Sequence, residues 1–439
     1  MDKTTTFAIH TLGCKVNTYE SDLISEKLRD EGFREVAFTE QADVYIINTC
    51  TVTNIADRKS RQMLHRVRKL SPGSLIVACG CYADAVSQGK GAPEPCVDLW
   101  VGNREKNILP ELLRNRLSDI KEPVPEKNVW EKRFLTELDG HTRAFVKIED
   151  GCGMFCSYCI IPYVRGPVTA RPVEDTVREV TGLSEKGVTE VVLTGIHLSS
   201  MGRELLRTIR EINAIPGIRR IRLGSLEPRL ITESFTEELK QYEKLCPHFH
   251  LSLQSGCDRI LRSMRRRYTT GEYQKGCEIL RSAWPDVAIT TDIIAGFPGE
   301  TEEDFRETLS FVREIGFYEA HIFKYSRRKG TEADRLPGQI PEAVKAERSG
   351  RLLSLSEEMS HEFRQRFVGK KLEFLAEECV NQSGKCFVTG YTGEYVRCML
   401  PWEENTPFRP GDLLSGTARG IVSGGADGES LLLTGNVVD

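Results

Sequence analysis

Three cysteines stand within eight residues of one another, Cys152, Cys156 and Cys159, in a C-x₃-C-x₂-C arrangement. Three thiolates can bind three irons of a 4Fe-4S cube, and the fourth iron is then free to bind a small molecule and pass it an electron. A zinc site would normally have a fourth ligand nearby, and the closest histidines, His141 and His197, stand at no ligand spacing. The spacing therefore predicts an iron–sulfur cluster with one open iron, and three unrelated buried thiols are the alternative.

Three further cysteines, Cys14, Cys50 and Cys81, stand just after predicted strands in the first part of the chain. If those strands are parallel, the three thiols emerge at one edge of a sheet and can meet at a second metal centre. Cys79 competes with Cys81, but it falls on the strand itself, where a side chain is expected to be packed. Seven other cysteines show no ligand spacing, and we expect packed or inert thiols at Cys96, Cys246, Cys257, Cys277, Cys379, Cys386 and Cys398.

Residues 1–118 alternate between predicted strands and helices, which indicates a small parallel α/β domain with function at the carboxyl ends of its strands. The expected strands are Thr6–Leu12, Val44–Asn48, Leu75–Cys79 and Val97–Val101. The expected helices are Thr18–Glu31, Asn54–Leu70 and Arg104–Leu117. A polar linker with two prolines is expected at 119–140.

Residues 141–368 continue the alternation in longer units, which indicates a partial (β/α)₆ barrel with its chemistry in the loops after the strands. The expected strands are Arg143–Glu149, Thr189–Leu193, Arg219–Leu223, His248–Leu253, Asp286–Ala295 and Tyr318–Tyr325. The helices that follow are expected to begin near Val173, Arg203, Thr232, Asp258, Thr270 and Thr301. The Cys152–Cys159 run would lie in the loop after the first strand, and Pro341–Val368 is expected to form one trailing helix.

Residues 369–439 contain short apolar runs separated by Gly, Asn and Asp, which predict a small β-barrel of the kind that often carries nucleic acid. The expected strands include Lys371–Cys379, Lys385–Tyr391, Glu394–Leu400 and Ser430–Thr434. The fold class is therefore α/β, with two α/β domains followed by this β-barrel.

Length and composition are consistent with this division. A chain of 439 residues is too long for one ordinary domain. No stretch approaches the roughly 20 apolar residues of a membrane span, and the segment Met1–Thr6 lacks the apolar core of a signal peptide, so we expect a cytoplasmic protein. Fourteen cysteines then indicate metal or redox chemistry rather than disulfides. The formal net charge of −4 gives no global attraction to nucleic acid, so RNA contacts must come from local patches.

Basic residues gather in two places. One run, from Arg58 to Lys69, is explained equally well by a solvated helix face. The second run follows the fourth predicted barrel strand, with Tyr268 beside it for stacking on a base, and it predicts RNA contact by Arg262, Arg265, Arg266 and Arg267.

The triplet Cys152, Cys156 and Cys159, with the aromatic Tyr158 before its last cysteine, resembles the radical S-adenosylmethionine (radical SAM) superfamily. In that superfamily SAM binds the open iron and is cleaved to methionine and a 5′-deoxyadenosyl radical. Two cysteine triplets followed by a β-barrel resemble the radical SAM methylthiotransferase family over essentially the whole chain. Gly13–Glu20, Thr49–Thr53 and Gly224–Pro228 resemble its MtaB branch.

The resemblance implies two 4Fe-4S clusters, SAM, and a C-terminal TRAM domain that binds tRNA. Polar or glycine-bearing ends of the barrel strands would hold SAM, although each is also explained by a turn or a helix cap. The expected cofactor-binding residues are Tyr158, Gly195, His197, Glu227, Ser252, Gln254, Asp292 and Gly296.

The resemblance further implies that the enzyme adds a methylthio group to carbon 2 of threonylcarbamoyladenosine next to the tRNA anticodon. It would need an electron donor such as flavodoxin or ferredoxin and a sulfur source. A threonylcarbamoyl group carries a carboxylate, and we expect Arg165, Arg171 or the Arg262–Arg267 run to pair with it. The alternatives are the same chemistry on isopentenyladenosine, as in the MiaB branch, or a non-catalytic iron–sulfur sensor that binds RNA.

Overall fold

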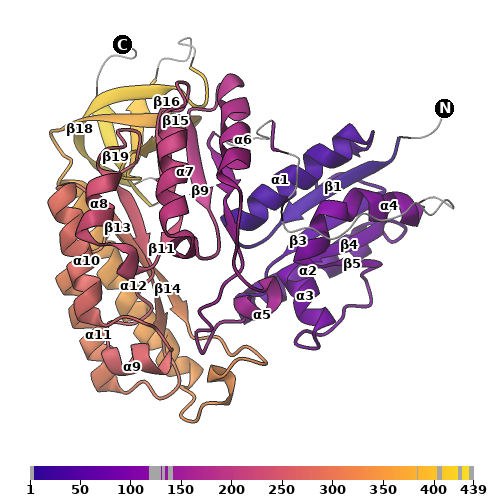
Figure 1. Ribbon diagram of the computed structural model, residues 1–439, viewed down its shortest axis with the longest axis horizontal. Helices are drawn as coiled ribbons and strands as arrows, with labels where there is room; N and C mark the ends of the chain where they lie inside the picture. Colours follow the sequence, from indigo (N-terminus) through magenta and orange to yellow (C-terminus); the bar gives the residue numbers. More distant parts are fainter. Residues whose placement is uncertain are drawn as a thin grey trace.

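The computed structural model describes residues 4–117, 130, 134–136, 142–382, 384–402, 408–423 and 428–434. They form an N-terminal α/β sheet, a central open barrel and a C-terminal closed β-barrel (Figure 1). Most of the expected linker, 119–140, lies outside the described residues. Within the described part of the chain, no helix is long and apolar enough to cross a membrane.

The N-terminal sheet is parallel throughout, with strand order β2-β1-β3-β4-β5. Its strands are β1 Thr6–Thr11, β2 Arg34–Glu35, β3 Val44–Thr49, β4 Leu75–Gly80 and β5 Leu99–Val101. Its helices are α1 Lys15–Asp30, α2 Asn54–Leu70, α3 Cys81–Ser87 and α4 Leu109–Leu117. Apolar residues of α1 and α4 cover one face of the sheet, and those of α2 cover the other. The predicted parallel α/β domain is confirmed.

Two helices of this domain differ from expectation. The first begins at Lys15 rather than Thr18, so Cys14 is its N-cap residue. The expected helix Arg104–Leu117 is divided into a 3₁₀ helix, η1 Asn103–Ile108, and α4. Pro110 explains the division, because its nitrogen has no hydrogen to continue an α-helical ladder from the preceding turn.

The central region forms two sheets, β10-β9-β6 and β11-β12-β13-β14, which meet where Ile221 bridges to Leu245. The strands are β6 Ala144–Lys147, β9 Glu190–Thr194, β10 Arg220–Leu223, β11 Ser225–Leu226, β12 His248–Leu251, β13 Ala288–Ala295 and β14 Glu319–Lys324. The helices that follow them are α6 Val173–Glu185, α7 Arg203–Asn213, α8 Glu233–Leu239, α9 Asp258–Ser263, α10 Thr270–Ala283 and α11 Glu302–Ile315. The predicted open barrel of β/α units is confirmed, with each expected strand within a few residues of its place.

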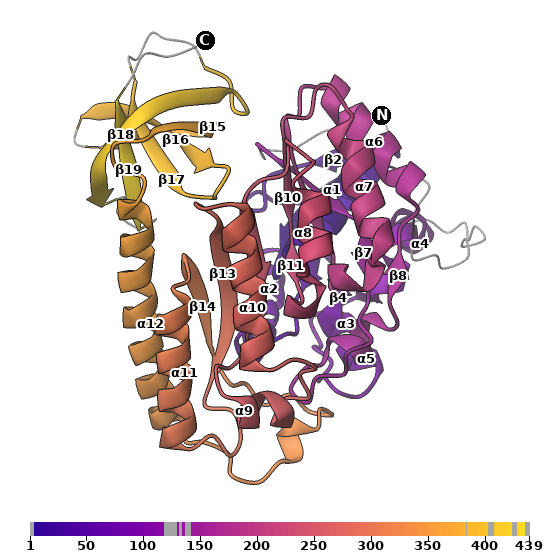
Figure 2. The same cartoon turned by 60° about the vertical axis from the view of Figure 1, so that its left-hand side comes forward.

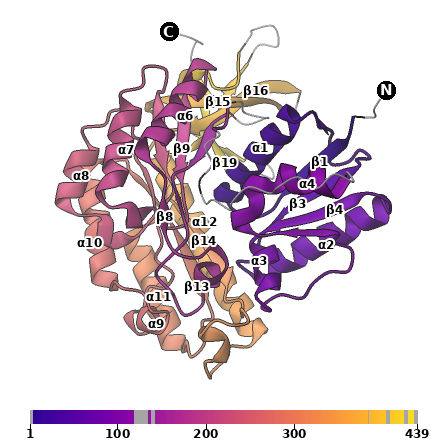
Figure 3. The same ribbon diagram turned by 45° about the vertical axis from the view of Figure 1, so that its right-hand side comes forward.

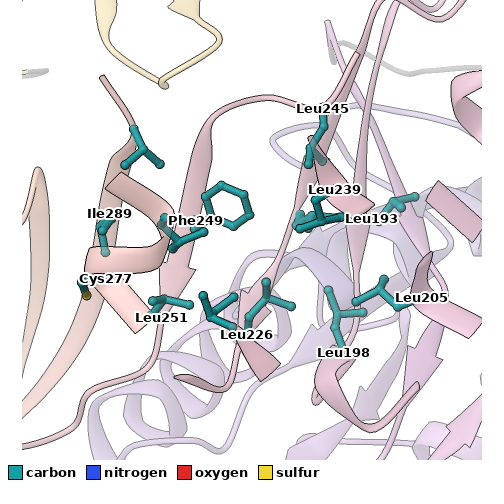
Figure 4. Packing of buried hydrophobic residues seen from close by; sticks show 14 of the residues in the cluster. Leu193, Leu198, Leu205, Leu226, Leu239, Leu245, Phe249, Leu251, Cys277 and Ile289 are labelled. Atoms are coloured by element: carbon teal, nitrogen blue, oxygen red, sulfur yellow. The ribbon is translucent and has the colours of Figure 1, made fainter. Parts of the chain in front are cut away.

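The barrel is held together by one large apolar core. Leucines from β9, α7 and the turn before α7 pack together, and Phe249 and Leu251 of β12 contact residues of α10 and β13 (Figure 4). This core lies between the sheet and its helices. The inner face of the strands is therefore free to carry polar side chains toward the N-terminal sheet.

The last section is a closed barrel with strand order β15-β16-β17-β19-β18, which confirms the predicted β-barrel. Its strands are β15 Lys371–Gln382, β16 Lys385–Thr392, β17 Arg397–Pro401, β18 Leu413–Ser423 and β19 Glu429–Thr434. The long helix α12 Glu342–Gln365 leads into it, and Phe363 and Phe367 share its core (Figure 2). The expectation of inert thiols is wrong for Cys379 and Cys386, which form a disulfide across the β15–β16 hairpin. The register pairs Cys379 with Val388 and Cys386 with Asn381, so the two cysteines are diagonal neighbours.

A buried charge network fastens the N-terminal sheet to the central barrel. Glu20 of α1 accepts hydrogen bonds from Lys106 at 2.5 Å, from Lys147 at 2.9 Å and from Arg165 at 3.1 Å. Arg165 also pairs with Asp150 at 2.9 Å. Although burial opposes ionisation, the charges of Arg165, Lys106 and Lys147 hold the pKa of Glu20 well below its ordinary value. The network joins two domains because Lys147, Asp150 and Arg165 belong to the barrel.

Replacing Glu20 by Gln should therefore destabilise the pairing of the two domains. The change leaves three buried cations around one carboxylate, and removing one partner of a buried ion pair costs about 3–5 kcal/mol. We expect a lower melting temperature by calorimetry, with Glu185→Gln, an exposed change on α6, as the matched control. Folding lowers the pKa of Glu20, so the stabilisation that its ionised carboxylate provides is complete at neutral pH. That stabilisation is lost only as the pH falls below about 4. A Glu20→Gln protein as stable as the control would contradict this role.

Candidate functional site

Both cysteine triplets line one cavity of roughly 720 Å³, between the N-terminal sheet and the inner face of the barrel. Figure 3 shows the carboxyl-terminal side of β1, β3 and β4 turned toward the open side of the barrel. The six lining cysteines are Cys14, Cys50, Cys81, Cys152, Cys156 and Cys159. A cavity of this volume is in the range of small-molecule sites. The two sets therefore belong to one site rather than to two separate surfaces.

The central triplet is formed by a loop directly after the first barrel strand. Cys156 is buried, and its sulfur accepts a hydrogen bond from Arg266 at 3.3 Å. Burial, and then the neighbouring sulfur of Cys156, raise the pKa of Cys159 to about 12. Burial raises the pKa of the Cys152 thiol to about 11, a backbone hydrogen bond from Met154 opposes the rise, and the charge of Cys156 adds to it. A cluster that binds these sulfurs as thiolates would offset the cost of their burial with the positive charge of its irons.

The N-terminal triplet is gathered by the three parallel strand ends. Gly13, with φ of +107°, lies against Cys50, and a Cβ on it would stand 2.8 Å from the Cys50 Cβ. Only glycine fits there, so the Gly13 turn brings Cys14 beside Cys50. Cys81 lines the cavity, whereas Cys79 is 0% exposed and packs in the apolar core under α1. The geometry favours Cys81 as the third ligand, as its position after the strand suggested.

The donor set fits iron–sulfur clusters at both places. Each triplet offers three sulfur ligands with apolar neighbours, and Cys81, Cys152 and Cys159 pack in one cluster with residues of α5 Ile161–Arg165. Sulfur ligands in an apolar surrounding suit iron–sulfur centres and leave room for a non-protein ligand on each. Cys152, Cys156 and Cys159 would hold one cluster, and Cys14, Cys50 and Cys81 the other.

Seven of the eight expected cofactor residues line the cavity. They are Tyr158, Gly195, His197, Glu227, Ser252, Gln254 and Asp292. Glu227 accepts a hydrogen bond from Arg266 at 2.5 Å, and the Nδ1 atom of His197 is buried with no hydrogen-bond partner in the described structure. A carboxylate and an unpartnered imidazole nitrogen next to the central triplet are groups that a polar cofactor can use.

The eighth residue, Gly296, is not among the lining residues. A Cβ on it would meet the Lys345 side chain at 2.4 Å, so this glycine admits the α12 side chain rather than a cofactor. Gly195 lines the cavity, but its missing Cβ makes room for Glu149 and Leu198. Glu149 was not anticipated from the sequence. Burial raises its pKa to about 7, and it accepts a hydrogen bond from the His197 amide at 2.6 Å.

The predicted RNA-binding arginines divide into two kinds. Arg262, Arg265 and Arg267 are exposed, as an RNA contact requires. Arg266 does not fit that expectation, because its side chain is only 5% exposed and bridges the Cys156 sulfur and Glu227. Tyr268 is buried as well and donates its hydroxyl hydrogen to the Ser252 carbonyl, so its ring is not open for stacking on a base. Arg266 therefore contacts the central cysteine triplet instead of facing solvent.

Arg165 and Arg171, expected to meet a substrate carboxylate, are already paired. Arg165 lies in the network with Glu20 and Asp150, and Arg171 forms a buried ion pair with Glu179. The cavity contains a different basic residue, Lys15, whose side chain is exposed to it. Burial within the cleft, and then the positive charges of Arg222 and Arg143, lower the pKa of Lys15 to about 8.

The middle of the cavity is polar. His250, Asp292 and His321 stand on neighbouring strands and point to one place, with 3.3 Å between the His250 Nε2 atom and the Asp292 carboxylate. Burial opposes ionisation of Asp292, but a hydrogen bond from His250 and the charge of that residue keep the pKa of Asp292 below its ordinary value. These side chains provide donors and acceptors between the two cysteine triplets and the basic residue Lys15.

Comparison with known proteins places the chain among related enzymes. The family model for the radical SAM superfamily matches residues 146–312, and "Uncharacterized protein family UPF0004" matches residues 6–102. Threonylcarbamoyladenosine tRNA methylthiotransferase MtaB of Bacillus subtilis is 37% identical over 91% of each chain, and the protein of that name from Aquifex aeolicus is 39% identical over 84% of this chain and 92% of its own.

A tRNA-2-methylthio-N(6)-dimethylallyladenosine synthase of Caldicellulosiruptor saccharolyticus is 38% identical over 85% of this chain and 83% of its own. Among solved structures, the radical SAM methyltransferase TsrM of Kitasatospora setae aligns with a TM-score of 0.57 at 16% identity and covers 75% of this chain and 77% of its own. That likeness shows a shared fold.

The choice between Cys81 and Cys79 can be tested by iron content. After anaerobic reconstitution, the unaltered protein should hold about eight irons per chain, by the four-iron stoichiometry of each cluster. Cys81→Ala should hold about four, because one ligand of the N-terminal triplet is lost, whereas Cys79→Ala should keep about eight. The two variants serve as each other's control, since both lose one sulfur from the same strand end. The opposite pattern would assign the ligand to Cys79, and equal iron in all three proteins would show that neither cysteine is needed as a ligand.

Proposed function

The chain belongs to the radical SAM methylthiotransferase family, in its MtaB branch, and on that premise we propose that it converts threonylcarbamoyladenosine beside the tRNA anticodon to its 2-methylthio form. The reaction type, a radical SAM tRNA methylthiotransferase, follows from the family; the substrate, the two clusters and the use of two SAM molecules are proposed. The observation that carries the proposal is the single cavity lined by both cysteine triplets.

We propose different roles for the cavity residues according to their positions. Cys152, Cys156 and Cys159 would hold the cluster to which SAM binds, and Glu227 and its partner Arg266 would orient the polar groups of SAM. A 4Fe-4S cluster with SAM on its open iron supplies, when bound, the one-electron chemistry that removes hydrogen from an aromatic carbon which no general base could ionise.

The other triplet, Cys14, Cys50 and Cys81, would hold the second cluster and the sulfur that is to be transferred. The two triplets come from different domains and line the same cavity, so one base in that cavity could face both. The base must leave its stack to reach this depth, as in base-flipping enzymes.

The three sections are proposed to be a cluster domain at 1–118, a radical SAM domain with its trailing helix at 141–368 and a tRNA-binding barrel at 369–439. Arg262, Arg265 and Arg267 stand exposed and are proposed to contact tRNA phosphates. A reduced flavodoxin or ferredoxin and a sulfur source would complete the cycle, which we propose takes place in the cytoplasm.

The alternative substrate is isopentenyladenosine, since a relative named for a dimethylallyladenosine product is 38% identical. An isopentenyl group is apolar and calls for an apolar pocket, whereas the far part of this cavity is lined by Lys15, His248, His250 and His321. A polar lining favours the substrate that carries a carboxylate.

Parallel assays on tRNA that carries threonylcarbamoyladenosine or isopentenyladenosine test the proposal. We expect the reconstituted protein to form the methylthio product on the first tRNA roughly tens- to hundredfold faster, because an unmade charge-assisted contact costs about 2–3 kcal/mol. Mass spectrometry of the digested nucleosides measures the product. Cys50→Ala should cleave SAM to 5′-deoxyadenosine without forming product, and Cys156→Ala should do neither. Equal turnover, or a preference for the isopentenyl substrate, would contradict the proposed substrate.

A further inference from the structure

One end of the cavity is basic and carries polar atoms that the protein leaves without partners. We name it the basic end and define it by three lining residues, Lys15, His248 and Tyr395, with Arg143 and Arg222 behind them. Lys15 comes from the N-terminal domain, His248 opens barrel strand β12, and Tyr395 follows β16 in the C-terminal barrel. All three domains therefore meet at this end of the cavity.

Lys15 is the one basic lining residue of the described cavity without an acidic partner. Four lysines and arginines line the cavity, and three of them are paired. Arg165 pairs with Asp150 at 2.9 Å, Arg266 with Glu227 at 2.5 Å and Lys324 with Glu342 at 3.7 Å. In the described part of the chain, the Lys15 ammonium has no ion pair or hydrogen bond.

The acids near this end are already neutralised. Glu190 lies below it and is contacted by three arginines, at 3.4 Å from Arg143, 3.8 Å from Arg220 and 3.1 Å from Arg222. Of the acids that line the cavity, Asp292 pairs with His250. Arg143 also pairs with Glu377, and Arg220 with Glu373 at 3.1 Å. Among the described ion pairs at this end, Lys15 is the cation left without an acid, and an anion that enters here is attracted to it.

His248 offers a second unpartnered polar atom. The residue is 6% exposed, its ring packs against Tyr395 at a centroid distance of 5.2 Å, and its Nδ1 atom has no hydrogen-bond partner in the described structure. Its Nε2 atom lies 3.4 Å from the Thr290 hydroxyl. When Nε2 accepts from that hydroxyl, Nδ1 carries the ring hydrogen and can donate it to an oxygen in the cavity.

Tyr395 is fixed in place and closes this end. Its ring lies 4.6 Å from the Arg222 guanidinium, and its hydroxyl accepts a hydrogen bond from Arg143 at 2.9 Å. Arg222 also donates to the carbonyls of Thr392 and Gly393, so the C-terminal barrel is held against the opening. The basic end is thus a preformed, rigid wall.

We propose that the basic end binds the carboxylate of the substrate's threonylcarbamoyl group, with Lys15 pairing with the charge and His248 donating to a carboxylate or hydroxyl oxygen. The inference rests on the proposed function and names the residues that select this substrate. In adenine one ring atom, N1, separates carbon 2 from carbon 6, so the bonds that leave the ring at these two carbons point in different directions. A base whose carbon 2 faces the two triplets therefore directs its carbon-6 substituent to another part of the cavity.

The test compares two RNA probes that differ only at one carboxyl group. One is an anticodon stem-loop with threonylcarbamoyladenosine, and the other carries the methyl ester of the same nucleoside. We expect the unaltered protein to bind the acid roughly ten- to hundredfold more tightly than the ester, by equilibrium binding without SAM. Lys15→Gln should lose that preference by weakening acid binding alone, whereas Lys15→Arg should keep most of it.

Two further variants control the test. Lys186→Gln removes an exposed lysine on the outer side of the barrel and should leave the preference unchanged. His248→Phe keeps the ring against Tyr395 and should lower the preference several-fold without abolishing it. Because Lys15 follows the proposed ligand Cys14, the iron content of each protein is measured to check that the cluster is retained. Binding is compared only as the ratio of the dissociation constants for the acid and the ester.

The outcomes separate this inference from the proposed function. If the unaltered protein modifies threonylcarbamoyladenosine and Lys15→Gln still prefers the acid as the unaltered protein does, the assignment of Lys15 is wrong while the function stands. A preference lost equally in Lys15→Gln and Lys15→Arg also overturns it, because the residue would then act through structure rather than charge. An unaltered protein that modifies only isopentenyladenosine overturns the proposed function first and this inference with it.

Discussion

The buried network around Glu20 is the interaction on which the rest of the site depends. Glu20 lies on α1, whose N-cap is Cys14, and Asp150 stands two residues before Cys152. Arg165 ends the short helix α5, which begins soon after Cys159. The charges that join the two domains are therefore attached by a few residues of backbone to both cysteine triplets. Any shift between the domains would separate the two sets of ligands, and the buried charges oppose such a shift because breaking their ion pairs leaves desolvated charges without a counter-charge.

The cavity that results brings several kinds of group together. The cysteines, the Glu227–Arg266 pair, the polar group of His250, Asp292 and His321, and the basic end all line it. Radical chemistry calls for the cluster ligands, whereas recognition of a charged substituent calls for a cation such as Lys15. The C-terminal barrel contributes Tyr395 to this cavity, so the domain proposed to bind tRNA also forms part of the pocket wall.

The fold could be predicted closely because its signals are local. Alternation of apolar runs with helical stretches gave the strands of both α/β domains, and the spacing of the cysteines selected the residues that line the cavity. Cys81 could be preferred to Cys79 because Cys79 falls on the strand itself, where a side chain is expected to be packed, whereas Cys81 follows the strand end. The split of the expected helix at Pro110 was also open to prediction, since proline lacks the hydrogen that a continuous helix requires.

Features that depend on long-range packing could not be predicted this way. The sequence shows Arg262 to Arg267 as one basic run, but only the fold reveals that Arg266 turns inward to Glu227. Gly296 looks like a cofactor loop until the α12 side chain of Lys345 is found in front of it. Likewise, Arg165 and Lys15 are both basic residues near cysteines, and their difference lies wholly in which acids, far away in the chain, reach them.

Electron paramagnetic resonance of the fully reduced protein tests most directly whether both triplets share one cavity. The spectrum of the protein with both clusters would be compared with the sum of two reference spectra. One comes from the variant with Cys14, Cys50 and Cys81 changed to Ala, and the other from the variant with Cys152, Cys156 and Cys159 changed to Ala. Two reduced clusters that share one cavity should interact magnetically, so the signal should be broadened or split beyond that sum. A spectrum that equals the sum of the two references would contradict the shared cavity.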